Sequence, residues 1–391
     1  TERGTHVVLT TFPGTQLDTP YSMNVIELCP VGALTSTDFR FRARVWEMSS
    51  TDGVCVGCAR GCNTHIWVRQ NEILRLTPRL NEEVNSYWMC DGGRLDTFKF
   101  VNGKDRLTGP MVRKDGSLVE VGWDEAIARV VSELKSFKKT EIAALGSPFA
   151  TNEDNYVFQR FAKEVLGTKH LDVVQHMKEG DEDDLLIRAD KTPNSTGARA
   201  VGIKPGDGGL DLQGIVRGIQ EGTIKALYVL EDDIASKPEL AGVLGSLQLL
   251  VVHSSVHNAT TEHADVVLAC STYAEKHGTF TNFQGRVQRI RPAVATLEQD
   301  RAMDGFAMSR WDKFAAQNDR WGRPMKKDAR PTWRIITAIA NALGAKMRYT
   351  TAEDVFREMS ERVPAFKSMN YLKLGNQGMM LTRSQPVSVH A

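Results

Sequence analysis

Four cysteines between residues 55 and 90 constrain this 391-residue chain more than any other feature. They read Cys55-Val-Gly-Cys58-Ala-Arg-Gly-Cys62, and the fourth, Cys90, follows after twenty-seven further residues. The short gaps let one tight loop direct three sulfurs toward a common centre, and a fourth sulfur that returns from a distance closes the site. Four thiolates are the ligand set of a [4Fe–4S] cluster, so the spacing predicts such a cluster here.

Two other uses of clustered cysteines remain open. Structural zinc sites commonly combine two Cys-x-x-Cys pairs, whereas the second half of this motif offers only Cys90. A disulfide framework does not need three cysteines in eight residues, and the first residues do not read as a secretory signal. The spacing therefore favours iron–sulfur over zinc, and zinc over disulfides. His65, shortly after Cys62, is more typical of a polar neighbour than of a ligand.

Charge and hydropathy exclude several classes of protein. The chain has 49 Lys and Arg against 48 Asp and Glu, so no basic bias indicates nucleic acid. Its longest apolar runs, such as residues 247–252, have the length of a strand and fall far short of the ~20 residues that span a membrane. We expect no direct membrane span. Because the chain starts at Thr1 without Met, we also expect it to be part of a longer polypeptide.

The pattern of apolar residues changes near residue 121. Before it we expect short strands, at 7–9, 66–69 and 72–76, and turns at Gln70-Asn71 and at 114–116. After it, helices and strands alternate, which predicts an α/β fold with a doubly wound, mostly parallel sheet. Helices are expected at 123–134, 151–166, 211–221, 333–343 and 353–363, and strands at 142–146, 226–230, 249–252 and 265–268.

Two segments interrupt this alternation. Residues 178–209 begin with an acidic run, 179–184, which is expected to be a solvated surface. Residues 286–331 are basic with interleaved Trp311 and Trp321, a composition that favours a protein-facing loop over RNA binding. Cys270 has no cysteine nearby and is expected to be a buried structural thiol.

Three stretches together resemble a known family. They are Cys29-Pro-Val-Gly-Ala-Leu-Thr-Ser36, Phe39-Arg-Phe-Arg-Ala-Arg-Val-Trp46, and the four-cysteine motif that closes with Cys90-Asp91. In combination they resemble the large iron–sulfur subunit (the G subunit, of the mitochondrial 75 kDa type) of NADH–quinone oxidoreductase, respiratory complex I. A further stretch, 264–288, is similar to the signature segment of the molybdopterin-oxidoreductase superfamily, of the formate dehydrogenase and DMSO reductase type.

The resemblance implies cofactors and partners. Cys29 would be the fourth ligand of a second [4Fe–4S] cluster on the main electron path, whose other ligands are missing, since the family's N-terminal ferredoxin-like region is absent from this chain. The cluster held by Cys55, Cys58, Cys62 and Cys90 would be set apart from that path. No residue would be catalytic, and no molybdenum cofactor is expected. The chain would pass electrons from NADH and FMN toward quinone beside the NADH/FMN-binding subunit and other peripheral-arm subunits. Its implied location is the cytoplasmic side of the bacterial inner membrane, and no nucleic acid partner is expected.

This view divides the chain into three parts and leaves two alternative functions. The parts are the end of a ferredoxin-like region (1–46), a small β-rich [4Fe–4S] domain (47–120) and a molybdopterin-oxidoreductase-like α/β domain (121–391).

One alternative is a molybdenum or tungsten enzyme of the formate dehydrogenase type. Residues 167–178 lack the cysteine that such enzymes place on the metal. A large anionic cofactor also needs many converging donors, whereas the residues that could bind it, Ser147, Lys276 and Arg286, are scattered along the chain. The other alternative is a scaffold whose cluster transfers no electrons.

Overall fold

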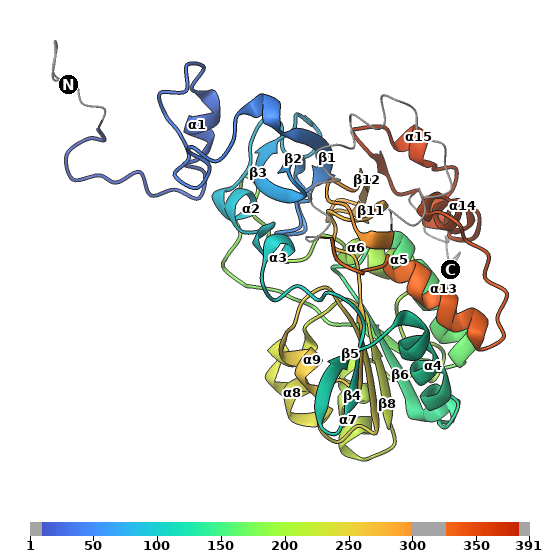
Figure 1. Cartoon of the computed structure of the whole chain (residues 1–391). Helices are drawn as coiled ribbons and strands as arrows, with labels where there is room; N and C mark the ends of the chain where they lie inside the picture. Colours follow the sequence, from blue (N-terminus) through green and yellow to red (C-terminus); the bar gives the residue numbers. More distant parts are fainter. Residues whose placement is uncertain (1–9, 299–325, 383–391) are drawn as a thin grey trace, which may run out of the picture.

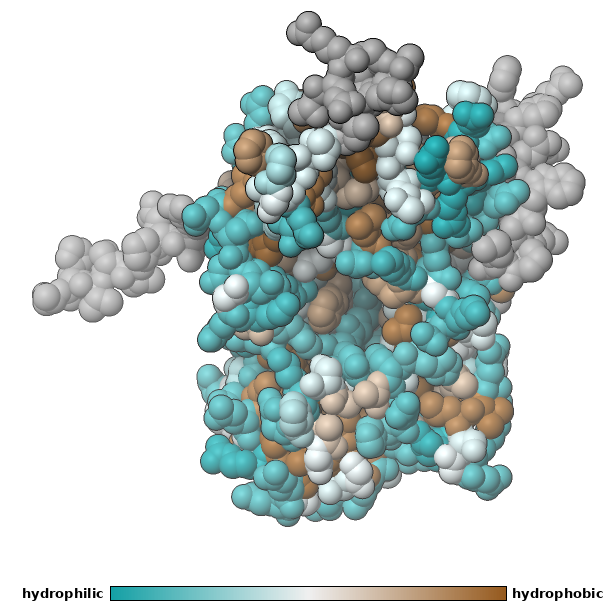
Figure 2. Space-filling view, turned by 90° about the vertical axis from the view of Figure 1, so that its left-hand side faces the viewer, coloured by the Kyte–Doolittle hydropathy of each residue, from teal (hydrophilic) through white to brown (hydrophobic). Residues whose placement is uncertain are grey.

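The computed structural model describes residues 10–298 and 326–382. The strand expected at 7–9 lies outside these residues. So do Trp311, Trp321 and most of the basic loop expected at 286–331. Figure 1 shows a small β-rich part, with an N-terminal arm beside it, above a larger α/β part. Figure 2 shows that one side of the molecule is hollowed at mid-height, between these two parts.

The small part is built on an antiparallel sheet in the order β1-β2-β3. Its strands are β1 (Ser49–Val54), β2 (Asn63–Arg69) and β3 (Glu72–Pro78). The hairpin expected between the last two is confirmed: Gln70 and Asn71 have φ values of 53° and 65°, as a tight hairpin turn requires. Two short helices follow, α2 (Asp91–Leu95) and α3 (Lys99–Asn102), and α1 (Asn24–Leu28) lies in the N-terminal arm.

The expected doubly wound sheet forms the centre of the α/β part. Its described strands are, side by side, β5 (Ser117–Glu120), β4 (Met111–Lys114), β10 (Val266–Ala269), β9 (Leu249–Ser254), β8 (Ala226–Val229), β6 (Ile142–Gly146) and β7 (His170–Val173). The strands from β10 to β7 are parallel. The direction of winding reverses between β6 and β8, and ligands of such sheets bind beyond the carboxyl ends of the strands at this switch point.

Helices cover both faces of this sheet, as Figure 1 shows. One face carries α4 (Trp123–Leu134), α5 (Asn152–Arg160) and α13 (Thr332–Ala342), and the other carries α7 (Leu212–Gln220), α8 (Pro238–Leu244) and α9 (Ala259–His263). Helix α14 (Ala352–Arg362) packs against α5. The short α6 (Ser195–Ala200) and α15 (Tyr371–Leu374) lie nearer the small part. The expected 151–166 helix changes to a π-helix at Phe161–Leu166 and ends at Gly167, whose φ is 68°.

One boundary differs from the expectation. The hairpin of β4 and β5 precedes residue 121 and is therefore expected in the cluster domain, but β4 pairs with β10 of the main sheet, Val112 opposite Val266. Turn signals locate a hairpin without indicating which sheet it joins. The small part therefore ends before Met111.

A second small sheet joins the two parts. It has the order β11-β12-β13, with β11 (Gly278–Thr281), β12 (Arg286–Ile290) and β13 (Met379–Met380). Phe280 and Ile290 from this sheet pack in the same apolar core as Cys55 and Cys62, whereas Val287 packs in the core of the main sheet. The signature segment 264–288 thus runs from the main sheet to the small part.

Candidate metal centre

The four cysteines of the motif surround one cavity. Cys55 follows β1, Cys58 and Cys62 lie in the loop before β2, and Cys90 is the N-cap residue of α2. All four line a cavity of about 370 Å³, which we call the thiol cavity. The structure thus brings together the four residues that the spacing predicts to share a site.

Backbone hydrogen bonds fix the loop that carries the first three thiols. Cys55 N donates to Cys62 O at 2.8 Å, which closes the loop, and Gly61, with φ of 63°, donates to Cys58 O at 3.3 Å. Gln288 Nε2 donates to Gly61 O at 2.8 Å. Because an added Cβ at Gly61 would lie 2.9 Å from that nitrogen, both conformation and space favour glycine here.

The start of α2 brings the fourth thiol close to the first. Gly93 N donates to Cys90 Sγ at 3.3 Å, and Gly57 N donates to Cys55 Sγ at 3.5 Å. An added Cβ at Gly93 would lie 3.1 Å from both the Cys55 and Cys90 sulfurs. Backbone amides that point at sulfur stabilise thiolates, and hydrogen bonds to sulfur are one means of adjusting cluster potentials.

The surroundings of the thiol cavity disfavour deprotonated cysteines that have no metal bound. Burial raises the pKa of Cys55, Cys62 and Cys90, and the neighbouring thiols raise the pKa of Cys55 and Cys62 further. Without a cation the thiols of Cys55, Cys62 and Cys90 therefore stay protonated at neutral pH. Metal binding supplies the compensating positive charge and releases the protons.

The ligand set of the thiol cavity fits a polynuclear group. In the described part of the chain, no three His, Cys, Asp or Glu side chains gather closely enough around one point to hold a single metal ion. Single zinc ions require short metal–sulfur contacts of about 2.3 Å, which crowd four sulfurs together. A cubane keeps its ligands further apart, because its own iron and sulfur atoms lie between them. The four thiols that line the thiol cavity are the ligand set of such a cubane.

Sequence reasoning missed the outer wall of the thiol cavity. Asp181, Leu186 and Lys191, from the 178–209 segment, line it, and Lys191 Nζ lies 2.8 Å from the Asp181 carboxylate. The acidic run is mostly exposed, in agreement with the solvated surface expected for it. Asp183 is the exception, because it accepts hydrogen bonds from the Tyr21 hydroxyl and from three successive backbone amides. These contacts join segments far apart in the sequence, so no local pattern links residues 178–209 to the cysteines.

Cys29 lies apart from the four-cysteine group, at the end of α1. Its sulfur accepts a hydrogen bond from Leu34 N at 3.5 Å, and surrounding backbone amides lower its thiol pKa. Buried Arg94 of α2 connects the two regions, since it donates to Glu27 at 2.8 Å and to Asn24 at 3.1 Å. The residue after Cys90, Asp91, accepts from Ser22 and Met23.

The three anion-binding candidates are all engaged within the protein. The ammonium of buried Lys276 lies 2.7 Å from both the Asp154 and Glu231 carboxylates. The Ser147 hydroxyl donates to Glu231 O, and Arg286 pairs with Glu83. None of the three points to an anionic ligand.

The other single candidates have structural surroundings. His176 Nε2 lies 2.9 Å from the Asp232 carboxylate, and Cys270 is 1% exposed, as expected for a structural thiol. His65 Nδ1 lies 3.2 Å from the carboxylate of Asp52, its partner on β1, and His65 is not among the residues that line the thiol cavity.

Comparison with known families identifies the class of protein. The molybdopterin oxidoreductase model matches residues 106–192 and 190–302, which together make up half of the chain. The chain therefore belongs to the molybdopterin oxidoreductase family. The 4Fe-4S domain of the NADH-ubiquinone oxidoreductase NDSU1/NuoG-like type matches residues 48–97, and the ferredoxin-like domain of NADH-quinone oxidoreductase subunit 3 matches residues 1–35.

Individual relatives narrow the comparison. The chain is 37% identical over 165 residues to the G subunit of NADH-quinone oxidoreductase from Rickettsia bellii and 40% identical over 174 residues to subunit 3 of the same enzyme from Thermus thermophilus. These matches cover 42% and 44% of this chain, but only 24% and 21% of the relatives. Acetylene hydratase from Pelobacter acetylenicus has the same fold, with a TM-score of 0.59 over 85% of this chain and 74% of that one, at 10% identity.

Every helix in residues 10–298 and 326–382 is too short or too polar to cross a lipid bilayer.

Proposed function

We propose that this chain is an electron-transfer and scaffold subunit of an NADH–quinone oxidoreductase, in which Cys55, Cys58, Cys62 and Cys90 hold one [4Fe–4S] cluster. The observation that carries the proposal is the convergence of these four thiols on one cavity, within a segment that matches the 4Fe-4S domain of that enzyme family. A bound cluster accepts and donates single electrons. The protein residues bind it, exclude water and set its surroundings.

Each part of the site has a defined task. The Cys55–Cys62 loop and the start of α2 supply the ligands, and Gly57 and Gly93 supply amides directed at sulfur. The α/β part braces the loop from behind: Ala59 N donates to Asp190 O and Ala59 O accepts from Phe283 N, each at 2.9 Å. A loop held in this way needs little rearrangement when the cluster changes charge, which favours electron transfer.

The second part of the proposal concerns Cys29. Its place in a segment that matches the ferredoxin-like domain supports a role as ligand of a second [4Fe–4S] cluster, completed by cysteines upstream of residue 1. In a longer chain that carries this upstream segment, Cys29→Ser should lower the iron content by about four atoms. An unchanged iron content would make Cys29 an ordinary thiol.

A molybdenum or tungsten enzyme of the formate dehydrogenase type is the alternative that the fold suggests. A pterin cofactor with phosphate groups needs converging donors and cations. The candidates here are engaged: Lys276 pairs with two carboxylates, and Arg286 pairs with Glu83. We therefore propose that no molybdenum cofactor binds. Molybdenum or tungsten near one atom per chain, with extractable pterin, would overturn this.

Partners and location follow from the same proposal. Large apolar side chains of the N-terminal arm are exposed, among them Phe41 at 92% and Trp46 at 82%. Exposed aromatic groups beside arginines are typical of protein interfaces. We expect this arm to face other peripheral-arm subunits, including the one that binds NADH and FMN, on the cytoplasmic side of the bacterial inner membrane.

Freeze-quench electron paramagnetic resonance of the assembled enzyme tests the function. After NADH is added, the cluster at Cys55–Cys90 should become reduced within the enzyme's turnover time, and Cys58→Ser should remove its signal alone. A cluster that stays oxidised under these conditions would favour the remaining alternative, a scaffold whose cluster transfers no electrons.

A further inference from the structure

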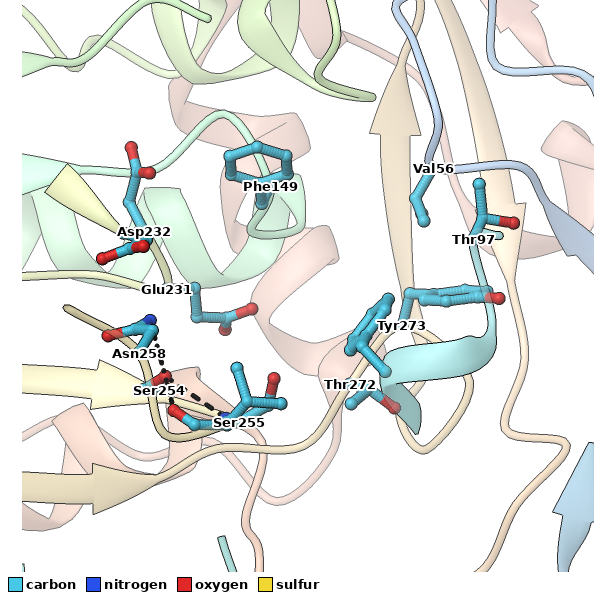
Figure 3. Close-up of a pocket in the computed structure, with 13 residues that line it drawn as sticks. Val56, Thr97, Phe149, Glu231, Asp232, Ser254, Ser255, Asn258, Thr272 and Tyr273 are labelled. Carbon is cyan, nitrogen blue, oxygen red and sulfur yellow. Dashed lines mark hydrogen bonds between the residues drawn. The ribbon is translucent and has the colours of Figure 1, made fainter. Parts of the chain in front are cut away.

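A second cavity lies directly behind the thiol cavity, where the main sheet ends. It has a volume of about 300 Å³, and we call it the sheet-end cavity. Val56, Thr97 and Tyr273 line one side, and Glu231, Asp232 and Ser254, which follow or end β8 and β9, line the other (Figure 3). Thr97 lines both cavities, and Val56 is the residue next to Cys55. The sheet-end cavity therefore lies between Glu231 and the residues next to the cluster ligands.

Glu231 belongs to a buried group that carries a net negative charge. The single ammonium of Lys276 lies 2.7 Å from Asp154 and 2.7 Å from Glu231, and the side chains of Lys276 and Asp154 are at most 1% exposed. Two carboxylates that share one cation leave one charge uncompensated within the trio. Removing such a charge from water is costly, and binding a proton is the simplest way to neutralise it.

The backbone at Glu231 is also unusual. Its φ is 36°, a left-handed value that residues with a side chain seldom adopt. Strain of this kind persists where the surrounding structure holds a residue in place, and it gathers at functional positions. The strain here aims the carboxylate toward Lys276 at the sheet-end cavity, at the switch point of the sheet.

We propose that Glu231 takes up a proton from solvent when the cluster at Cys55–Cys90 receives an electron, so that this part of the interior keeps its charge. The inference rests on the proposed function, because it requires a reducible cluster. One electron from a one-electron donor enters the cluster, and one proton enters through the sheet-end cavity and binds a carboxylate oxygen of Glu231. Reoxidation returns both.

The electrostatic surroundings support this assignment. Burial, with a further contribution from nearby Asp154, raises the pKa of Glu231 to about 7, although Lys276 and Thr332 act in the opposite direction. An added electron nearby raises it further, since charges interact strongly across a water-poor interior. Among the described residues, the other titratable or charged groups around this site are Cys270, Tyr273, Tyr228, Asp232, Asp233, His176, His253, Arg106 and Glu275.

Those neighbours are less suited to the role. Arg106 and Glu275 neutralise each other in a buried pair, 2.7 Å apart. His253 is neutral, because burial lowers its pKa to about 3. Asp232 is paired with His176, and Asp233 accepts hydrogen bonds from the Thr260 amide and hydroxyl.

A redox titration of the cluster-containing chain at pH 6 to 9 tests the proposal. The midpoint potential of the wild type should be constant below about pH 7 and then fall, by at most about 59 mV for each tenfold drop in proton concentration. Glu231→Gln, which mimics the protonated form, should remove this dependence and hold the potential at the low-pH value. Glu239→Gln, the same charge change at an exposed site on α8, should behave like the wild type.

A second measurement needs no variant. The infrared difference spectrum of the wild type, reduced minus oxidised, should gain the C=O stretch of a protonated carboxyl group. A midpoint potential independent of pH, a Glu231→Gln variant with the wild-type slope, or a spectrum without this band would overturn the proposal. A purified chain without any reducible cluster would instead contradict the proposed function.

Discussion

Gly93 determines how closely the Cys55 and Cys90 sulfurs can approach the start of α2. Its Cα lies where a methyl group would be 3.1 Å from both sulfurs, nearer than carbon and sulfur normally approach. The neighbouring Gly92 has no such restriction, since an added Cβ would meet only the end of the Asp96 side chain at 3.9 Å. Two adjacent glycines therefore differ in what they do for the site.

Alanine substitution of Gly93 tests this arrangement, and the same substitution of Gly92 is the control. Gly93→Ala should push Cys90 away from Cys55 and lower the iron and sulfide content of the purified chain several-fold, whereas Gly92→Ala should keep both at the wild-type level. Chemical analysis for iron and acid-labile sulfide measures the effect. Equal iron content in the two variants would mean that the four sulfurs do not share one cluster.

His253 links stability to pH. Burial lowers its pKa to about 3, whereas in the unfolded chain it stays near 6.5. Between these values the unfolded state binds the extra proton, so this residue's contribution to stability is complete above pH 6.5 and is lost as the pH falls. From pH 7 to pH 5 the loss amounts to about 2 kcal/mol.

Replacement of this histidine should reduce the loss. His253→Gln should make the urea-unfolding free energy about 2 kcal/mol less sensitive to the change from pH 7 to pH 5. Buried acids such as Glu153 act in the opposite direction in both proteins, so only the difference between the two is informative. His257→Gln, at an exposed position, is the control and should leave the pH dependence unchanged.

Among the elements, α2 connects the two cysteine regions. Its N-cap is Cys90, and its buried Arg94 holds α1 through Glu27 and Asn24. Helix α1, which is followed directly by Cys29, is thus attached to the element that carries the fourth ligand. We expect a substitution in α2 to alter the surroundings of both Cys29 and Cys90.

Arg94→Gln tests this attachment. Loss of two charge-assisted hydrogen bonds should cost about 2 kcal/mol locally, which corresponds to roughly 30-fold faster amide hydrogen exchange in α1. Lys99→Gln removes the exposed ion pair with Asp96 and should leave exchange in α1 unchanged. Exchange that is equally slow in both variants would show that other contacts hold the arm.

Elements with a strong local signal were predictable from the sequence. Thr151 caps α5 and Gly167 ends the helical segment, as their residue types indicated, and the β2–β3 turn followed from Gln70-Asn71. The partner of the β4–β5 hairpin was not predictable, because it depends on the pairing of Val112 with Val266, far away in sequence. Local patterns specify an element, whereas its neighbours are set by the packing of the whole sheet.

In the molecule as a whole, the sequence predicted which cysteines come together, but it did not predict the residues that surround them. Close spacing identified Cys55, Cys58 and Cys62, and Cys90 completed the set, but nothing local placed Lys191 or Gln288 against the same site. The sheet-end cavity, likewise, forms only when Thr97 and Tyr273 of separate segments meet Glu231. Such contacts carry no signature in a single sequence, since each residue type is ordinary in its own segment.

The central claim is that Cys55, Cys58, Cys62 and Cys90 hold one [4Fe–4S] cluster. Mössbauer spectroscopy with iron quantification, on the anaerobically purified chain labelled with ⁵⁷Fe, tests it most directly. We predict about four irons per chain in the spectrum of a single oxidised cubane, and their loss in Cys58→Ser. Stoichiometric zinc with negligible iron, or iron that persists in Cys58→Ser with the same spectrum, would contradict it.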